Sequence, residues 1–295
     1  MNLKITLIAA VLLAAATACT TASQSDFAGM SFSDRPLTGK VIWNDLITED
    51  LPAAKQFYGG LFGWTFEDGQ ADGSGAYIVA RDDEIYVAGI RSVEPRQDGK
   101  KLTRWLPYVS VDDVDTAVER SKAGGATVAV EARNLNLGRV AAIIDPEGAV
   151  IGLASSSIGD PDDRTTSAAP GRVVWSELLS RDTVAASGFY RLLAGYDINV
   201  IERRGGLYTL LSNNGVNRAG IMPRPADDGD PVWLTYFGVR DPKAAAARAK
   251  ELGGTVLLPP SPDVREGTMA IVTDPVGAVL VLQKAPDPNQ RTLRV

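Results

Sequence analysis

The feature that most constrains this chain is an internal repeat. The segment VIWNDLITEDLPAAKQFYGGLFGW, which begins at Val41, aligns without gaps with VVWSELLSRDTVAASGFYRLLAGY, which begins at Val173. Both regions also end in the pattern Asp-Pro-x-Gly-Ala between two apolar runs, first at Asp145 and again at Asp274. Repeats of this length indicate a fold built twice from one unit, so a chain of 295 residues is expected to contain two similar domains.

Hydrophobic periodicity predicts the same order of elements in both regions, namely a strand, a helix and several strands, and then this order again. Each region should therefore contain two βαβββ units. The elements expected in the first region are a strand at 41–47, a helix from Asp50 to Gly63, strands at 76–80, 85–90 and 106–111, and a helix from Asp112 or Asp113 to Gly124. In the second region Asp241-Pro242 marks a helix start, because proline suits the first helical position.

The domain boundaries follow from the repeat and from a change in composition between its copies. The stretch SSSIGDPDDRTTSAAPG is rich in Ser, Pro and Asp, which is typical of a linker. The expected organisation is a signal segment at 1–19, a tether at 20–38, domains at 39–155 and 171–284, a linker at 156–170, and a C-terminal tail at 285–295.

The N-terminus is expected to be a targeting segment. An apolar run at 5–18 follows Lys4 and has the length of a signal-peptide core, which is too short for a membrane span. The run ends at Cys19, after small residues, and so resembles a bacterial lipoprotein signal in which the cysteine is acylated. We therefore expect a lipid-anchored protein of the bacterial cell envelope that faces the periplasm. The alternative is ordinary cleavage that leaves a soluble periplasmic protein.

Two residue types are scarce, and their scarcity limits the chemistry. The chain contains no histidine, and Cys19 is its only cysteine. The commonest general base, the commonest ligand of catalytic zinc and any thiolate cluster are therefore excluded. The formal net charge is −6 and the chain has no basic tract, so nucleic acid is not expected as a partner.

Several short motifs occur in order in both copies: FY followed by LFGW in the first helix, V-x-D-V-D before the second helix, GG-x-V after it, and the closing DP-x-G. Together they resemble the vicinal oxygen chelate superfamily, the group of glyoxalases, bleomycin-resistance proteins and extradiol dioxygenases. The similarity is greatest to two-domain glyoxalase-like proteins whose domains open with W-x-E-L. The fold that this resemblance implies is α+β, with two tandem vicinal oxygen chelate domains, each built of paired βαβββ units that form a cup-shaped sheet.

The resemblance also implies a divalent metal in each cup, bound by His or Gln on the first strand, His on the fifth and Glu on the last. The family spacing leads to Trp43, Leu106 and Gly152 in the first copy. In the second copy it leads to Trp175, Leu234 and Val281. None of these side chains can donate a lone pair to a hard divalent ion, so neither a metal nor any other cofactor is expected.

Strand alternation predicts what replaces the metal ligands. If Trp43 points into the first cup, Asp45 does too, and Tyr108 follows from Leu106. The matching residues of the second cup are Trp175, Glu177 and Tyr236. An apolar surface with a few polar groups is typical of a small-molecule pocket, and these side chains suit a planar or aromatic ligand. The same alternation places Trp105 and Trp233 on the opposite face.

The two cups are expected to differ in one respect. Arg139 is predicted to pair with Asp45 and to help bind a ligand, whereas Thr268 stands at the matching place of the second copy. We therefore expect any activity in the first cup. The alternative is that the tryptophans only pack in the core and that Asp45 and Glu177 only accept hydrogen bonds from tyrosine or backbone groups.

Three functions remain open. We favour a metal-free envelope protein, a monomer or homodimer, that binds a small, aromatic molecule and meets the membrane only through its acylated N-terminus. The first alternative is a lyase or isomerase of the glyoxalase or dioxygenase type, with Asp45 or Glu177 as general base or with a non-standard metal site. The second is a structural protein whose cups are filled by their own side chains.

Overall fold

The computed structural model describes two eight-stranded sheets, one in each half of the chain. The described residues are 24, 27, 29–69, 75–99, 101–163, 169–203, 206–224 and 229–285. The predicted α+β fold with paired βαβββ units in each of two tandem domains is confirmed.

The first sheet has the strand order β2-β3-β4-β1-β5-β8-β7-β6. Its elements are β1 (Val41–Thr48), α1 (Leu51–Phe62), β2 (Thr65–Asp68), β3 (Tyr77–Asp82), β4 (Ile85–Ser92), β5 (Arg104–Ser110), α2 (Val114–Ala123), β6 (Thr127–Leu135), β7 (Gly138–Ile144) and β8 (Val150–Ser156). The first strands of the two units, β1 and β5, pair antiparallel at the centre, so both units contribute to one curved sheet.

The second sheet repeats this order as β10-β11-β12-β9-β13-β16-β15-β14. Its elements are β9 (Val173–Ser180), α3 (Thr183–Ala194), β10 (Asp197–Arg203), β11 (Gly206–Asn213), β12 (Val216–Pro223), β13 (Val232–Val239), α4 (Pro242–Glu251), β14 (Thr255–Leu258), the short helix η2 (Arg265–Gly267), β15 (Met269–Thr273) and β16 (Val279–Lys284).

Aspartates begin the helices, as the sequence predicts. Asp50 and Asp182 accept hydrogen bonds from the first backbone N–H groups of α1 and α3. Asp113, and not Asp112, is the N-cap of α2. Gly63 ends α1 with a φ of 77°, a conformation that glycine adopts without steric cost. Each helix is thereby fixed at the end of a central strand.

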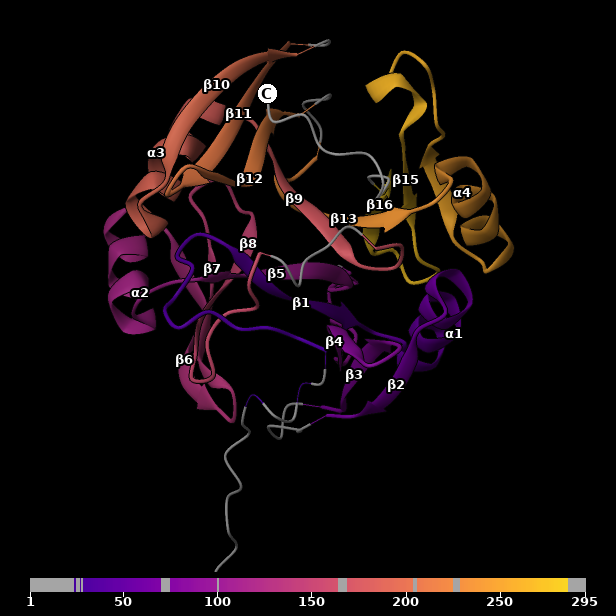
Figure 1. The fold of residues 1–295 in the computed structure, drawn as a ribbon, viewed down its shortest axis with the longest axis horizontal. Coiled ribbons are helices and arrows are strands. Elements are labelled where there is room, and N and C mark those ends of the chain that lie inside the picture. The colour runs from indigo at the N-terminus through magenta and orange to yellow at the C-terminus, as the bar shows by residue number, and fades with distance from the viewer. Residues whose placement is uncertain are drawn as a thin grey trace, which may run out of the picture.

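The two domains pack through the faces of their sheets that carry the helices. Figure 1 shows α1 beside α4 on one side of the molecule and α2 beside α3 on the other, with the β1–β8 and β9–β16 sheets between them. One buried cluster contains Trp64 and Trp105 of the first domain together with Phe237 of the second. The concave face of each sheet therefore points away from the domain interface.

Two matching chains of hydrogen bonds cross this interface. Trp105 Nε1 donates to the Tyr58 hydroxyl at 3.0 Å, and that hydroxyl donates to Asp274 Oδ2 at 3.2 Å. In the other half, Trp233 Nε1 donates to the Tyr190 hydroxyl, which donates to Asp145, each at 2.8 Å. Trp105 and Trp233 thus lie on the faces away from the cups, as expected, and the aspartate of each DP-x-G turn accepts a hydrogen bond from the other domain.

Part of the expected tether is bound to the beginning of the expected linker. The Ser33 backbone N–H donates to the backbone oxygen of Asp160, and the Leu37 N–H donates to the Asp160 carboxylate. Phe32 forms an isolated β-bridge with Pro161. Cys19 and the rest of the predicted signal segment lie outside the described residues. No helix among the residues that the structure describes is long and apolar enough to cross a membrane.

Candidate functional site

The concave face of the first sheet, which we call cup 1, brings four polar aromatic and acidic side chains together. Trp43 and Asp45 lie on β1, Tyr77 on β3 and Tyr108 on β5, with Trp43 opposite Tyr108 in the antiparallel register. Trp43, Tyr77 and Tyr108 are half-buried, whereas Asp45 is only 5% exposed. Cup 1 therefore has a carboxylate at its floor and aromatic side chains that solvent still reaches.

The Asp45 carboxylate is held by donors from two strands. Trp43 Nε1 donates to Oδ1 at 2.8 Å, and the Tyr77 hydroxyl donates to the same oxygen at 2.9 Å. Burial raises the pKa of Asp45, against the opposing effects of these donors and of the Arg91 charge. The carboxylate is consequently positioned, desolvated and easier to protonate than an ordinary aspartate.

Two glycines make room for this arrangement. A Cβ at Gly89 on β4 would overlap both the Asp45 carboxylate and the Tyr77 hydroxyl. A Cβ at Gly152 on β8 would overlap the Tyr108 ring. The Tyr77 and Tyr108 side chains therefore lie directly over the backbone of Gly89 and Gly152. Any residue with a Cβ at either glycine position would fill that space.

The second sheet forms a matching cup 2 from Trp175, Glu177, Tyr208 and Tyr236. The Tyr236 hydroxyl donates to Glu177 Oε1 at 2.6 Å, and Trp175 Nε1 donates to the Tyr208 hydroxyl at 2.9 Å. Tyr208 again lies over a glycine, Gly220. The same chemical set thus occurs at matching strand positions in both domains.

Cup 2 differs because an arginine forms an ion pair with its carboxylate. Arg265, from η2, donates through Nη2 to Glu177 Oε2 at 2.7 Å. Its guanidinium carbon lies 5.3 Å from the centre of the Tyr236 ring and 5.9 Å from that of Tyr208. Glu177, Tyr208 and Tyr236 are buried beneath it. Cup 2 is therefore filled by side chains of its own domain.

The predicted pairing of Arg139 with Asp45 is wrong. Arg139 forms a bidentate ion pair with Asp115 of α2, with both N–O distances 2.7 Å, and also donates to Asn134. The cause is strand alternation, because Arg139 is an odd number of residues from Ala142, which pairs with Gly152 in cup 1. Arg139 thus lies on the helix-bearing face of the sheet.

Comparison with known proteins adds to this geometry. A family model for the Glyoxalase/Bleomycin resistance protein/Dioxygenase superfamily matches residues 40–153. CFP32 of Mycobacterium tuberculosis, provisionally named a glyoxylase, is 35% identical over 250 residues, which are 83% of this chain and 94% of that protein. The chain belongs to this superfamily.

Other proteins are similar to this chain over most of its length. The anthracycline biosynthesis protein DauV of Streptomyces sp. is 31% identical over 253 residues, 81% of this chain and 91% of that protein. The Mn(II)-bound glyoxalase from Novosphingobium aromaticivorans shares the fold with a TM-score of 0.57 at 18% identity, over 84% of this chain and 83% of that one. The 2,3-dioxygenase LapB from Pseudomonas sp. KL28 does so with a TM-score of 0.53 at 15% identity, over 88% and 96%.

The metal that the glyoxalase superfamily implies does not fit the cups of this member. In cup 1 the inferred ligand positions hold Trp43, Leu106 and Gly152, and the Tyr108 ring fills the space over Gly152 where a ligating side chain would lie. Across the described part of the chain, no three His, Cys, Asp or Glu side chains form a group that could bind a metal ion. Each cup offers a single carboxylate, Asp45 or Glu177, beside aromatic and hydroxyl groups, which is too few metal-binding side chains for a divalent ion.

The cups also contain side chains that were not expected from the sequence, among them Tyr77, Tyr208 and Arg265. Tyr77 and Tyr208 stand at the same spacing before the shared AGI of β4 and β12, so a longer repeat alignment would have found them. Arg265 has no counterpart in the first copy, because it lies in a loop between β14 and β15 that the repeat does not preserve. Only its position in the fold reveals it.

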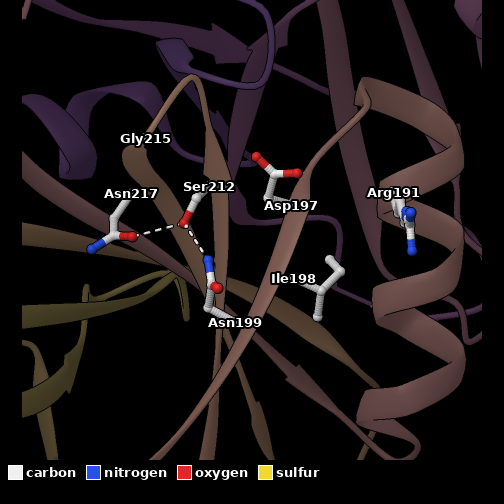
Figure 2. Close-up of a pocket in the computed structure, with 7 residues that line it drawn as sticks. All are labelled: Arg191, Asp197, Ile198, Asn199, Ser212, Gly215 and Asn217. Atoms are coloured by element: carbon white, nitrogen blue, oxygen red, sulfur yellow. Dashed lines mark hydrogen bonds between the residues drawn. The ribbon is translucent and has the colours of Figure 1, made fainter.

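A surface depression of about 480 Å³ lies outside both cups, between α3 and β10–β12. Figure 2 shows Arg191 on the helix and Asn199, Ser212 and Asn217 on the strands, where Asn199 donates to the Ser212 hydroxyl and that hydroxyl donates to Asn217. Its lining contains no aromatic ring, and these polar groups bond one another, so we place the candidate site in cup 1.

Proposed function

We propose that cup 1 binds a small, planar aromatic molecule that donates a hydrogen bond to Asp45, without a metal. The observation that carries this proposal is a carboxylate that is 5% exposed beneath three half-buried aromatic side chains. Each further hydrogen-bond donor stabilises a buried carboxylate. A ligand ring can stack on aromatic side chains that are still partly exposed. An aromatic ligand with a hydroxyl or N–H group would supply both contacts.

The relatives support an aromatic ligand. DauV is named for anthracycline biosynthesis, and an anthracycline contains fused aromatic rings. Cup 1 presents Trp43 and Tyr108 side by side on adjacent strands, which gives a flat ring two surfaces to contact. The filling of cup 2 by Arg265 makes cup 1 the more accessible of the two.

Binding of 2-naphthol, measured by calorimetry, tests this proposal. Asp45→Asn should weaken binding by about 1.5–3 kcal/mol, the range for hydrogen bonds to charged groups, or at least tenfold in Kd. The matched change in cup 2, Glu177→Gln, should leave the affinity unchanged, and so should a chelator. Equal affinity of the wild type for 2-methoxynaphthalene, which lacks the donor, would contradict the proposal.

A second candidate function is proton transfer in a lyase or isomerase reaction, with Asp45 as general base. The raised pKa of Asp45 favours this role, because a carboxyl that releases its proton nearer neutral pH is a stronger base. Glu177 is less suited to it, since Arg265 already binds its second oxygen. A reaction that Asp45→Asn abolishes while 2-naphthol binding persists would establish this function in place of simple binding.

We also propose attachment to the envelope through Cys19, on the evidence of the apolar run that ends at the chain's only cysteine. Cys19→Ser should move the protein from the membrane fraction to the soluble fraction of a bacterial host. A wild-type protein that is already soluble would contradict lipidation and favour the soluble periplasmic alternative.

A further inference from the structure

The contents of cup 2 are those of a cation-binding cage. Trp175, Tyr208 and Tyr236 supply aromatic rings, and Glu177 supplies a fully buried negative charge. The guanidinium of Arg265 lies among them, bound to the carboxylate and within about 6 Å of two ring centres, the range of cation–π contacts. Such cages are used to recognise organic cations. In cup 2 the occupant comes from the chain itself.

The loop that carries this occupant has an unusual backbone. Arg265, Glu266 and Gly267 have φ values of 45°, 57° and 74°, so two successive residues with side chains adopt the left-handed region. Conformations of this kind cost free energy and persist where the surroundings enforce them. Here the Glu177–Arg265 ion pair is a contact that the loop gains in return. The loop is therefore held over cup 2 partly by the side chain that it inserts.

The arginine has a route out of the cage. Its side chain is 30% exposed, whereas the Glu177 side chain is fully buried. Because the Arg265 side chain is already partly exposed, its guanidinium can move into solvent and be hydrated there. Glu177 cannot be left alone, because an unpaired buried carboxylate is strongly disfavoured. Whatever replaces Arg265 must consequently bring its own positive charge.

We propose that cup 2 is a binding site for a small organic cation, a guanidinium or an alkylammonium, and that Arg265 occupies it as an internal ligand. An external cation takes its place between Glu177 and the rings when the 261–267 loop moves outward. The site is separate from cup 1 and does not depend on the function proposed there. The apparent affinity of cup 2 for an external cation is reduced because the cation can bind only those molecules in which Arg265 has left the cage.

Ethylguanidinium is a suitable probe, with ethylurea as a neutral molecule of the same shape. Arg265→Ala removes the internal ligand and should bind ethylguanidinium at least tenfold more tightly than the wild type, with a rise in Tm. Ethylurea should produce neither effect. In the double variant Arg265→Ala/Glu177→Gln, the affinity for ethylguanidinium should fall at least tenfold relative to Arg265→Ala.

Two results would overturn the proposal. One is equal affinity of the wild type and Arg265→Ala for ethylguanidinium, which would mean that Arg265 does not compete for the site. The other is undiminished binding by the double variant, which would place the cation elsewhere. Should Arg265→Ala not fold, Arg265→Gln keeps a hydrogen-bond donor for Glu177 while removing the charge, and the same outcomes apply to it.

Discussion

Cup 1 and cup 2 share one framework and differ in what fills it. In both, a tryptophan and a carboxylate on the first strand meet tyrosines from two other strands of the sheet, and the tyrosine of β3 or β11 lies over a glycine. In cup 1 the tyrosines are half-buried, whereas in cup 2 Tyr208 and Tyr236 are 4% and 2% exposed. Two arginines lie over the cup 2 tyrosines, Arg265 from its loop and Arg203 from β10, whose guanidinium carbon is 4.0 Å from the centre of the Tyr208 ring. Strand register thus fixes the framework, and the side chains that cover it differ between the cups.

The largest expected effect on stability follows removal of Arg265, the residue that distinguishes cup 2 from cup 1. Arg265→Ala leaves Glu177 charged and buried, so the free energy of unfolding should fall by about 3 kcal/mol, the lower part of the range for breaking a buried pair. Arg139→Ala removes the exposed ion pair with Asp115, and its effect on the free energy of unfolding should be much smaller. Urea unfolding measures both. Similar losses in the two variants would show that the Glu177–Arg265 pair is no more important than a surface pair.

The glycines test the part that the cups have in common. Gly89→Ala and Gly220→Ala each insert a methyl group where a tyrosine hydroxyl lies, so each should destabilise the protein by about 2 kcal/mol, as overpacking does. Gly188 lies within α3 and an added Cβ there meets no atom within 4 Å. Gly188→Ala should therefore stabilise the protein by about 0.5–1 kcal/mol. If only one of Gly89→Ala and Gly220→Ala destabilised the protein, the two frameworks would not be equivalent.

The smallest expected effect concerns the pH dependence that Asp45 adds. Because burial raises its pKa above the ordinary 3.8, the folded state binds this proton more tightly than the unfolded state does. The contribution of Asp45 to stability is therefore complete below about 3.8 and is lost as the pH rises through the raised value. The stability of the wild type relative to Asp45→Asn should fall across this window and then level off. A relative stability that increases with pH would contradict the direction of the shift.

The backbone of both domains could be predicted from the sequence, because helix caps and strand alternation are local properties. Trp43, Asp45 and Tyr108 lie together as alternation requires. Tyr77 and Tyr208 join the cups through register between strands, which a single strand does not encode. Arg265 could not be predicted, since its position depends on an irregular loop with three successive left-handed residues.

The interdomain hydrogen bonds have a consequence for how the two cups became different. Tyr58 and Tyr190 are matching residues of the two copies, and so are Asp274 and Asp145, so the contacts Tyr58–Asp274 and Tyr190–Asp145 are one contact made twice. This reciprocity defines an isologous interface, as between the subunits of a symmetric dimer. In a homodimer every substitution appears in both subunits. Joined in one polypeptide, the halves keep the dimer's interface without its enforced identity, and an arginine can form an ion pair with the carboxylate of one cup but not with that of the other.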